Sequence, residues 1–206
     1  MPRYLPIQGT DGWDKDQWWK AGSPFTTAMA RVGWDLLQSE DPFVWSTDLD
    51  GANPLALVCR PWQRREAKHR DWEAGGLALH YFLKDVPYED RNLVSHSHGL
   101  QVVLYAARHG SKIRSLIDIS GPVRGDMSIV TDMARPQIAR WVHVYDQKTD
   151  WIAWAGQLFD GRLAVSRAHP EADINISLQG VGHSGLLRDP ALFPLLPTHV
   201  FPEVRL

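Results

Sequence analysis

Residues 92–110, NLVSHSHGLQVVLYAARHG, place one serine between two histidines. Two chemistries use such residues: a metal site built from His96 and His98, or a nucleophilic hydroxyl on Ser97. Alternating histidines share a face on a straight strand, but not where the chain turns between them. The segment contains no Asp or Glu, and no histidine-rich partner segment completes a ligand set. The pattern therefore favours Ser97 as a nucleophile, and we expect no metal.

The sequence around Ser97 has a strand–turn–helix pattern. An apolar strand is predicted over 92–95, and an amphipathic helix over 98–109. This is the setting of a nucleophile elbow, a sharp turn that holds the serine at its tip in a strained backbone conformation. Gly99 leaves room for the turn, and the amide of His98 can stabilise an oxyanion at the start of the helix.

A serine hydroxyl needs a base to take its proton and a third group to orient that base. The segment LQGVGHSGLL follows the last predicted strand and places His183 in a glycine-flanked loop. The acid is expected in the loop before that strand, where WVHVYDQKTDWIAWAG offers Asp146 and Asp150. Asp146 directly ends the strand and is expected to brace the turn. We therefore predict Asp150 as the acid, with Asp118 as the next candidate.

These residues require a framework of alternating strands and helices. Short runs rich in β-branched or aromatic residues alternate with helical patterns. The alternation predicts an α/β fold with a mostly parallel sheet of about six strands and helices on both faces, whose functional groups gather at the carboxyl ends of the strands. The Gly75–Gly76 pair either weakens its helix or lets it approach a neighbour closely. Strands are predicted over 4–8, 43–46, 92–95, 113–119, 141–145 and 174–178, and helices over 23–38, 65–84 and 98–109.

Length and composition indicate one globular domain spanning residues 1–206. The net charge is −2, and acidic residues interrupt the basic segment 60–72, so we expect no nucleic-acid partner. No apolar run approaches the roughly 18 residues of a membrane span, so no stable membrane insertion is expected. The N-terminus has no basic segment followed by an apolar run, which favours a cytoplasmic location.

Taken together, these motifs resemble the α/β-hydrolase family, and within it the lipase- and esterase-like branch that has HGT near the first strand and GHSHGG at the elbow. Gln8 stands in place of the family's histidine, Ser95 in place of the first elbow glycine and Leu100 in place of the last. The segments that carry the resemblance, in the family's order, are IQGTDGW, NLVSHSHG, ISGPV, VHVYDQKTDWI and VGHSGLL.

The resemblance implies a serine hydrolase that cleaves carboxylic esters through a Ser97–His183–Asp150 triad and an acyl-enzyme. The chain order serine, aspartate, histidine is that of the family. It also implies an oxyanion hole formed by the backbone amides of Thr10 and His98. No cofactor is expected.

Aromatic residues follow both the predicted oxyanion loop and the predicted acid. We expect Trp13, Trp18, Trp151 and Trp154 to flank the cleft and to line an apolar pocket for a small-molecule or lipid ester. Segment 126–140 lies where the family carries its cap. Because this segment is short, the lid is expected to be small or absent.

Two alternatives use the same residues. A thioesterase or amidase has the same triad, and a catalytically inactive protein with this fold only binds its ligand. Rapid reaction with a fluorophosphonate separates an active serine from an inert or metal site.

Overall fold

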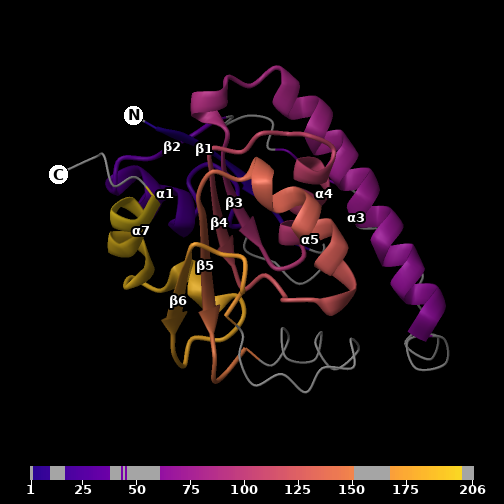
Figure 1. Cartoon of the computed structure of the whole chain (residues 1–206). Helices are drawn as coiled ribbons and strands as arrows, with labels where there is room; N and C mark the ends of the chain where they lie inside the picture. Colours follow the sequence, from indigo (N-terminus) through magenta and orange to yellow (C-terminus); the bar gives the residue numbers. More distant parts are fainter. Residues whose placement is uncertain are drawn as a thin grey trace.

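The structure, a computed structural model, describes residues 2–9, 17–37, 43, 45, 61–150 and 168–200. Six strands form one sheet in which all neighbours are parallel (Figure 1). The predicted α/β architecture, with a parallel sheet of about six strands, is confirmed. The strands are β1 (Arg3–Ile7), β2 (Asp35–Leu36), β3 (Asn92–His96), β4 (Ser115–Ile119), β5 (Trp141–Asp146) and β6 (Ile174–Leu178).

Helices cover both faces of the sheet, as predicted. One face packs α1 and α7, and the other packs α3, α4 and α5 (Figure 1). Successive strand residues alternate between two apolar clusters: Leu93 lies in the cluster with α3 and α4, and Val94 lies in the cluster with α1 and α7. The helices are α1 (Pro24–Arg31), α3 (Pro61–Lys84), α4 (Gly99–Arg108), α5 (Ser128–Ala134) and α7 (Leu192–Val200).

The Gly75–Gly76 pair lets α3 lie close to its neighbours. A Cβ added at Gly76 would lie 2.3 Å from the Cβ of Tyr105 on α4, and one added at Gly75 would lie 3.2 Å from the Cβ of Trp45. Any side chain at Gly76 would therefore force the two helices apart. The close-approach alternative is confirmed.

The helix predicted over 23–38 is wrong at its C-terminal end. Ser23 caps α1 as expected, accepting a hydrogen bond from the amide of Thr26 at 3.1 Å. The helix stops at Arg31, and Gly33 has a φ of 88°, a conformation that glycine adopts at low cost. The chain then forms β2, which pairs with β1.

The strand predicted over 43–46 is not found where the structure describes it. Phe43 and Trp45 lie outside any strand, and residues 44 and 46 lie outside the described residues. The indole nitrogen of Trp45 donates a hydrogen bond of 2.8 Å to the carbonyl of Gln8. Its aromatic side chain therefore packs in the core, and β2 forms the sheet edge instead.

Segment 126–140 forms a connection within the helical layer. It contains α5, whose Val130 and Ala134 belong to the apolar cluster shared with α4. In the part of the chain that the structure describes, this segment is a crossover between β4 and β5. Among the described helices, none combines the length and hydrophobicity needed to cross a bilayer.

The strand order β2-β1-β3-β4-β5-β6 contains one reversal. The chain leaves β1 toward β2 on one side and then crosses to β3 on the other. In open parallel sheets of this kind, ligands bind outside the carboxyl ends of the strands, beside such a reversal. The ends of β1 and β3 therefore mark the expected position of a functional site.

Candidate active site

The tip of the turn between β3 and α4 is Ser97. Its φ is 54°, in the left-handed region that a residue with a side chain rarely adopts. The Ser97 amide donates to the carbonyl of Ile119 at 3.0 Å, and its carbonyl accepts from the amide of Leu100 at 3.2 Å. These bonds fix the strained turn that a nucleophile elbow requires.

Two glycines bring the end of β1 against this turn. A Cβ added at Gly99 would lie 2.5 Å from the carbonyl oxygen of Ile7 and 2.7 Å from that of Gln8. A Cβ added at Gly9 would lie 2.9 Å from the Cβ of Ser97. The backbone that follows β1 therefore passes directly beside Ser97, at the reversal of the strand order.

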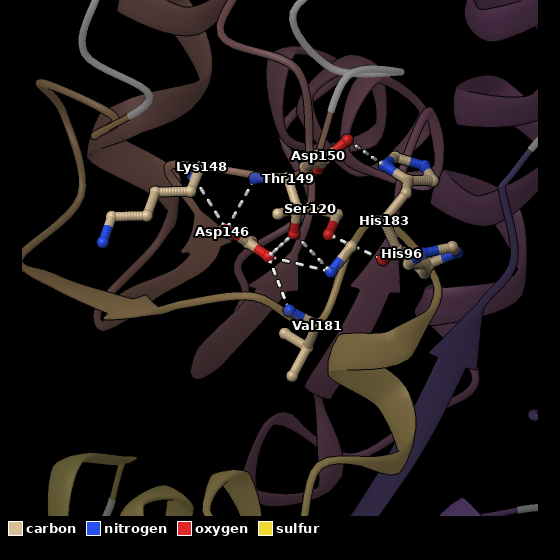
Figure 2. Close-up of polar contacts among 9 residues, drawn as sticks. His96, Ser120, Asp146, Lys148, Thr149, Asp150, Val181 and His183 are labelled. Carbon is tan, nitrogen blue, oxygen red and sulfur yellow. Dashed lines mark hydrogen bonds and ion pairs between the residues drawn. The ribbon is translucent and has the colours of Figure 1, made fainter.

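His183 and Asp150 form a pair, as Figure 2 shows. The imidazole Nδ1 lies 3.0 Å from Asp150 Oδ1, and the Asp150 side chain is only 1% exposed. Because a carboxylate accepts, Nδ1 carries the proton of the neutral ring, and the lone pair of Nε2 is available to a proton donor. Of the predicted acids, Asp150 is the one that contacts His183.

The main chain of His183 rests against the elbow strand. Its carbonyl accepts from Ser120 Oγ at 2.9 Å and from His96 Nε2 at 3.3 Å (Figure 2). The ring of His96, the residue before Ser97, lies 4.9 Å from the ring of His183 between centroids. Among the described residues, Ser97 Oγ makes no hydrogen bond to His183, and catalytic hydrogen bonds often tighten only when substrate binds.

His96 supports the elbow as a neutral side chain. Burial, with a smaller contribution from nearby His183, lowers the pKa of His96 to about 3. Because a carbonyl only accepts, His96 Nε2 carries a proton and donates it in the hydrogen bond to the main-chain carbonyl of His183. Trp18 packs edge-on against the His96 ring and against Phe25. The described contacts of Trp18, which is 3% exposed, are those of a core residue beneath the elbow.

Asp146 braces the turn and the loop that carries His183. Its Oδ1 accepts from the amides of Lys148 at 2.8 Å and Thr149 at 3.0 Å. Its Oδ2 accepts from the amides of Val181 and Gly182, both at 2.8 Å, and from the Thr149 hydroxyl (Figure 2). Burial favours the neutral acid, but these hydrogen bonds outweigh burial and hold the pKa of Asp146 well below its usual range.

Asp118, the third candidate acid, is paired elsewhere. Its Oδ2 lies 2.6 Å from His143 Nδ1, both side chains are fully buried, and Ser95 Oγ lies 3.4 Å from its Oδ1. The three residues occupy adjacent register positions on β3, β4 and β5. Burial raises the pKa of Asp118, while His143 acts in the opposite direction.

The His98 side chain is held by stacking. Its ring lies 5.1 Å from that of Trp72, with an interplanar angle of 27°. The Arg124 guanidinium carbon lies 5.2 Å from the centroid of the Trp72 ring, and Arg124 forms an ion pair with Asp126. The stack fixes His98 at the N-cap of α4, where its carbonyl accepts from the amide of Gln101 at 3.1 Å.

Several predicted site residues lie outside the described residues: Thr10, Trp13, Trp151 and Trp154. Within the described ranges, no group of three or more His, Cys, Asp or Glu side chains is arranged to hold a metal.

Sequence reasoning missed Ser120 and the pairing of Asp118 with His143. A charged residue inside the apolar strand SLIDI is a signal of a buried partner. For Ser120, the only signal in the sequence is its position between a predicted strand and a Gly-Pro pair.

No protein-family model matches this chain, and no curated protein sequence matches it significantly. Several solved structures match it, and three of them each cover 97% of this chain. The esterase domain of a Rhodothermus marinus protein has 13% identity and a TM-score of 0.49 over 88% of its own chain. A predicted CIB-like hydrolase from Thermoplasma acidophilum has 9% identity and a TM-score of 0.49 over 84% of its chain. A sugar hydrolase from Lactococcus lactis has 11% identity and a TM-score of 0.47 over 86% of its chain.

Proposed function

We propose that this protein is a serine hydrolase of the α/β-hydrolase type that cleaves carboxylic esters. The observation that carries the proposal is the pairing of His183 with buried Asp150. The imidazole of His183 also packs against the ring of His96, the residue before Ser97. Ser97 itself has the strained backbone of a nucleophile elbow at the reversal of the strand order. A strained residue beside a base with an oriented tautomer is typical of nucleophilic catalysis.

In the proposed acylation step, Ser97 Oγ attacks the acyl carbon and its proton passes to His183 Nε2. Asp150 stays ionised and accepts from Nδ1, which stabilises the imidazolium. The carbonyl oxygen becomes an oxyanion and is stabilised by the amides of His98 and Thr10. The bond to the leaving oxygen then breaks, and His183 gives its proton to the departing alcohol.

Deacylation repeats the same steps with water. His183 Nε2 takes a proton from water as the water oxygen attacks the acyl carbon of the ester on Ser97. The bond between that carbon and Ser97 Oγ breaks, and the proton returns to Oγ. The products are a carboxylic acid and the free enzyme, so atoms balance without a cofactor.

The proposal is tested by turnover of p-nitrophenyl esters by the purified protein, with and without a chelator. Ser97→Ala removes the nucleophile and should abolish turnover while leaving the melting temperature nearly unchanged. Ser184→Ala, in the neighbouring sequence GHSG, is the matched control and should keep turnover. Turnover that survives in Ser97→Ala, or that the chelator removes, overturns the proposal.

The same assay compares substrate classes. Activity on thioesters or amides but not on esters would move the assignment to a thioesterase or amidase. Absence of turnover on all three would support the inactive binding protein instead.

A chain-length series then examines the pocket. With segment 126–140 in the helical layer, we expect short and medium acyl chains to be preferred. Activity that rises steeply with chain length and jumps at an oil–water interface contradicts this expectation and indicates a mobile lid.

A further inference from the structure

The loop that carries His183 depends on side chains from the sheet for its position. Gly180 and Gly182 have φ values of 81° and 74°, and a Cβ at either would meet no atom of the described residues within 4 Å, so side-chain packing against those residues does not hold the loop there. Its backbone is held at consecutive residues instead. Asp146, at the end of β5, accepts from the amides of Val181 and Gly182.

The carbonyl of His183 is held by two further side chains. It accepts from His96 Nε2 at the end of β3 and from Ser120 Oγ just after β4 (Figure 2). The Ser120 bond is the shorter of the two, at 2.9 Å against 3.3 Å. Residues at the ends of three adjacent strands therefore fix three consecutive residues of the loop.

Ser120 is itself rigidly placed. Its φ is 55°, and its amide donates to the carbonyl of Val144 at 2.8 Å, which extends the ladder between β4 and β5 by one residue. A Cβ added at Gly121 would lie 2.2 Å from Asp118 Oδ1, so the chain folds tightly over the buried pair of Asp118 and His143. A left-handed backbone at a residue with a side chain persists only where its surroundings determine it.

Ser97 and Ser120 share this local geometry. Each is the first residue after its strand, their φ values are 54° and 55°, and each donates its amide to the next strand. They differ in their hydroxyl groups. Ser120 is fully buried, and its Oγ donates to His183. Ser120 is therefore unsuited to act as a nucleophile and suited to hold the base.

We infer that Ser120 is a positioning residue that holds the main chain of His183 so that its Nε2 meets the nucleophile. The inference rests on the proposed function for its effect on turnover. The bond from His183 Nδ1 to Asp150 fixes the rotation of the ring, whereas the position of the His183 main chain depends on the bonds to its backbone. A displacement of about 1 Å at a reacting group can cost about 100-fold in rate. The Ser120 bond prevents such a displacement.

Two variants and one control separate positioning from stability. Ser120→Gly removes the hydroxyl and relieves the positive φ, so its melting temperature should equal or exceed that of Ser120→Ala. Ser115→Ala is the matched control, because buried Ser115, at the opposite end of β4, donates through Oγ to Asn92 at 2.9 Å. It loses a similar bond far from the site.

Each variant is measured for kcat and KM on a p-nitrophenyl ester, for the pH profile of kcat/KM, and for the downfield proton resonance of His183 Nδ1. In both Ser120 variants we expect kcat to fall about 10- to 100-fold, with KM changing by less than about twofold. The acid limb of the profile should shift, and the resonance should broaden or exchange faster. Ser115→Ala should change none of these.

A Ser120→Gly protein that keeps wild-type kcat, pH profile and His183 resonance overturns the inference. The same holds if the three proteins lose activity in proportion to their loss of stability. If wild-type protein turns over no ester, the proposed function fails, and the resonance still decides whether Ser120 holds His183.

Discussion

Replacing each of the two loop aspartates by asparagine should give opposite results. Asp146 Oδ2 accepts from the amides of Val181 and Gly182, and Oδ1 accepts from those of Lys148 and Thr149. An amide has only one accepting oxygen. In Asp146→Asn, an amide nitrogen turned toward Lys148 and Thr149 leaves both of their backbone amides without this acceptor. Turned toward the loop, it leaves the Val181 amide without one, while the Gly182 amide keeps Thr149 Oγ1 at 3.0 Å.

The magnitude follows from the one or two backbone bonds that are lost. A hydrogen bond to a charged group contributes about 1.5–3 kcal/mol, so Asp146→Asn should lower the free energy of unfolding by about 1.5–6 kcal/mol. For a chain of this length, that is a fall in melting temperature on the order of 10 °C. At temperatures well below its own melting temperature, Asp146→Asn should lose far less kcat than Asp150→Asn.

Asp150 accepts one hydrogen bond that bears on the chemistry, from His183 Nδ1 at 3.0 Å. An asparagine there can present its NH₂ group to the ring and favour the tautomer in which Nε2 carries the proton. In a serine protease, this change of the acid lowers turnover about 10⁴-fold with little change of geometry. We expect a similar loss in Asp150→Asn, with a melting temperature close to that of wild type.

The two variants are compared by thermal unfolding and by kcat on p-nitrophenyl butyrate at one temperature well below both transitions. Ser115→Ala calibrates the effect of lost stability alone. The reasoning is refuted if Asp150→Asn keeps most of its activity, or if Asp146→Asn is inactive at an unchanged melting temperature.

Two further predictions concern packing and acid stability. Gly99→Ala forces a Cβ against the carbonyls that end β1 and should cost about 1–3 kcal/mol of stability and about 100-fold in kcat, measured by denaturant unfolding and ester turnover; wild-type values would contradict the close approach. Burial lowers the pKa of His169 to about 3, as it does for His96. Below pH 6.5 the unfolded chain therefore binds more protons than the folded chain, and the free energy of unfolding decreases as the pH is lowered. His169→Gln should reduce that slope by up to about 1.4 kcal/mol per pH unit between pH 6 and pH 4, and an unchanged slope in urea titrations would contradict the assignment.

The strand, turn and helix around Ser97 were predictable because their signals are local. An apolar run, a turn with Gly99 and an amphipathic stripe lie within 92–110, and each has one structural interpretation. The order of strands and helices along the chain likewise predicted the parallel sheet. The expectation that Asp146 braces its turn followed from the tendency of an aspartate directly after a strand to bond its own turn, and Asp146 does so. The role of Asp150 as the acid stays a prediction.

Other features depend on contacts between distant parts of the chain. The bond from Ser120 to His183 joins residues 63 positions apart, and the bond between Asp118 and His143 joins residues 25 apart and needs the register of β4 with β5. The edge strand β2 contains only Asp35 and Leu36, which lie in a segment whose pattern predicts a helix. Pairing with β1 outweighs that helical pattern. Such tertiary contacts leave no periodic signal in a single sequence.

The most direct test of the central claim is mass spectrometry of the protein after treatment with a fluorophosphonate. The account predicts one adduct, on Ser97, formed rapidly in wild-type protein and absent from Ser97→Ala. It further predicts much slower labelling in Asp150→Asn, because the base is then held in the wrong tautomer. An adduct on Ser120 or Ser184, or no adduct on a protein that still hydrolyses esters, would contradict the assignment of Ser97 as the nucleophile.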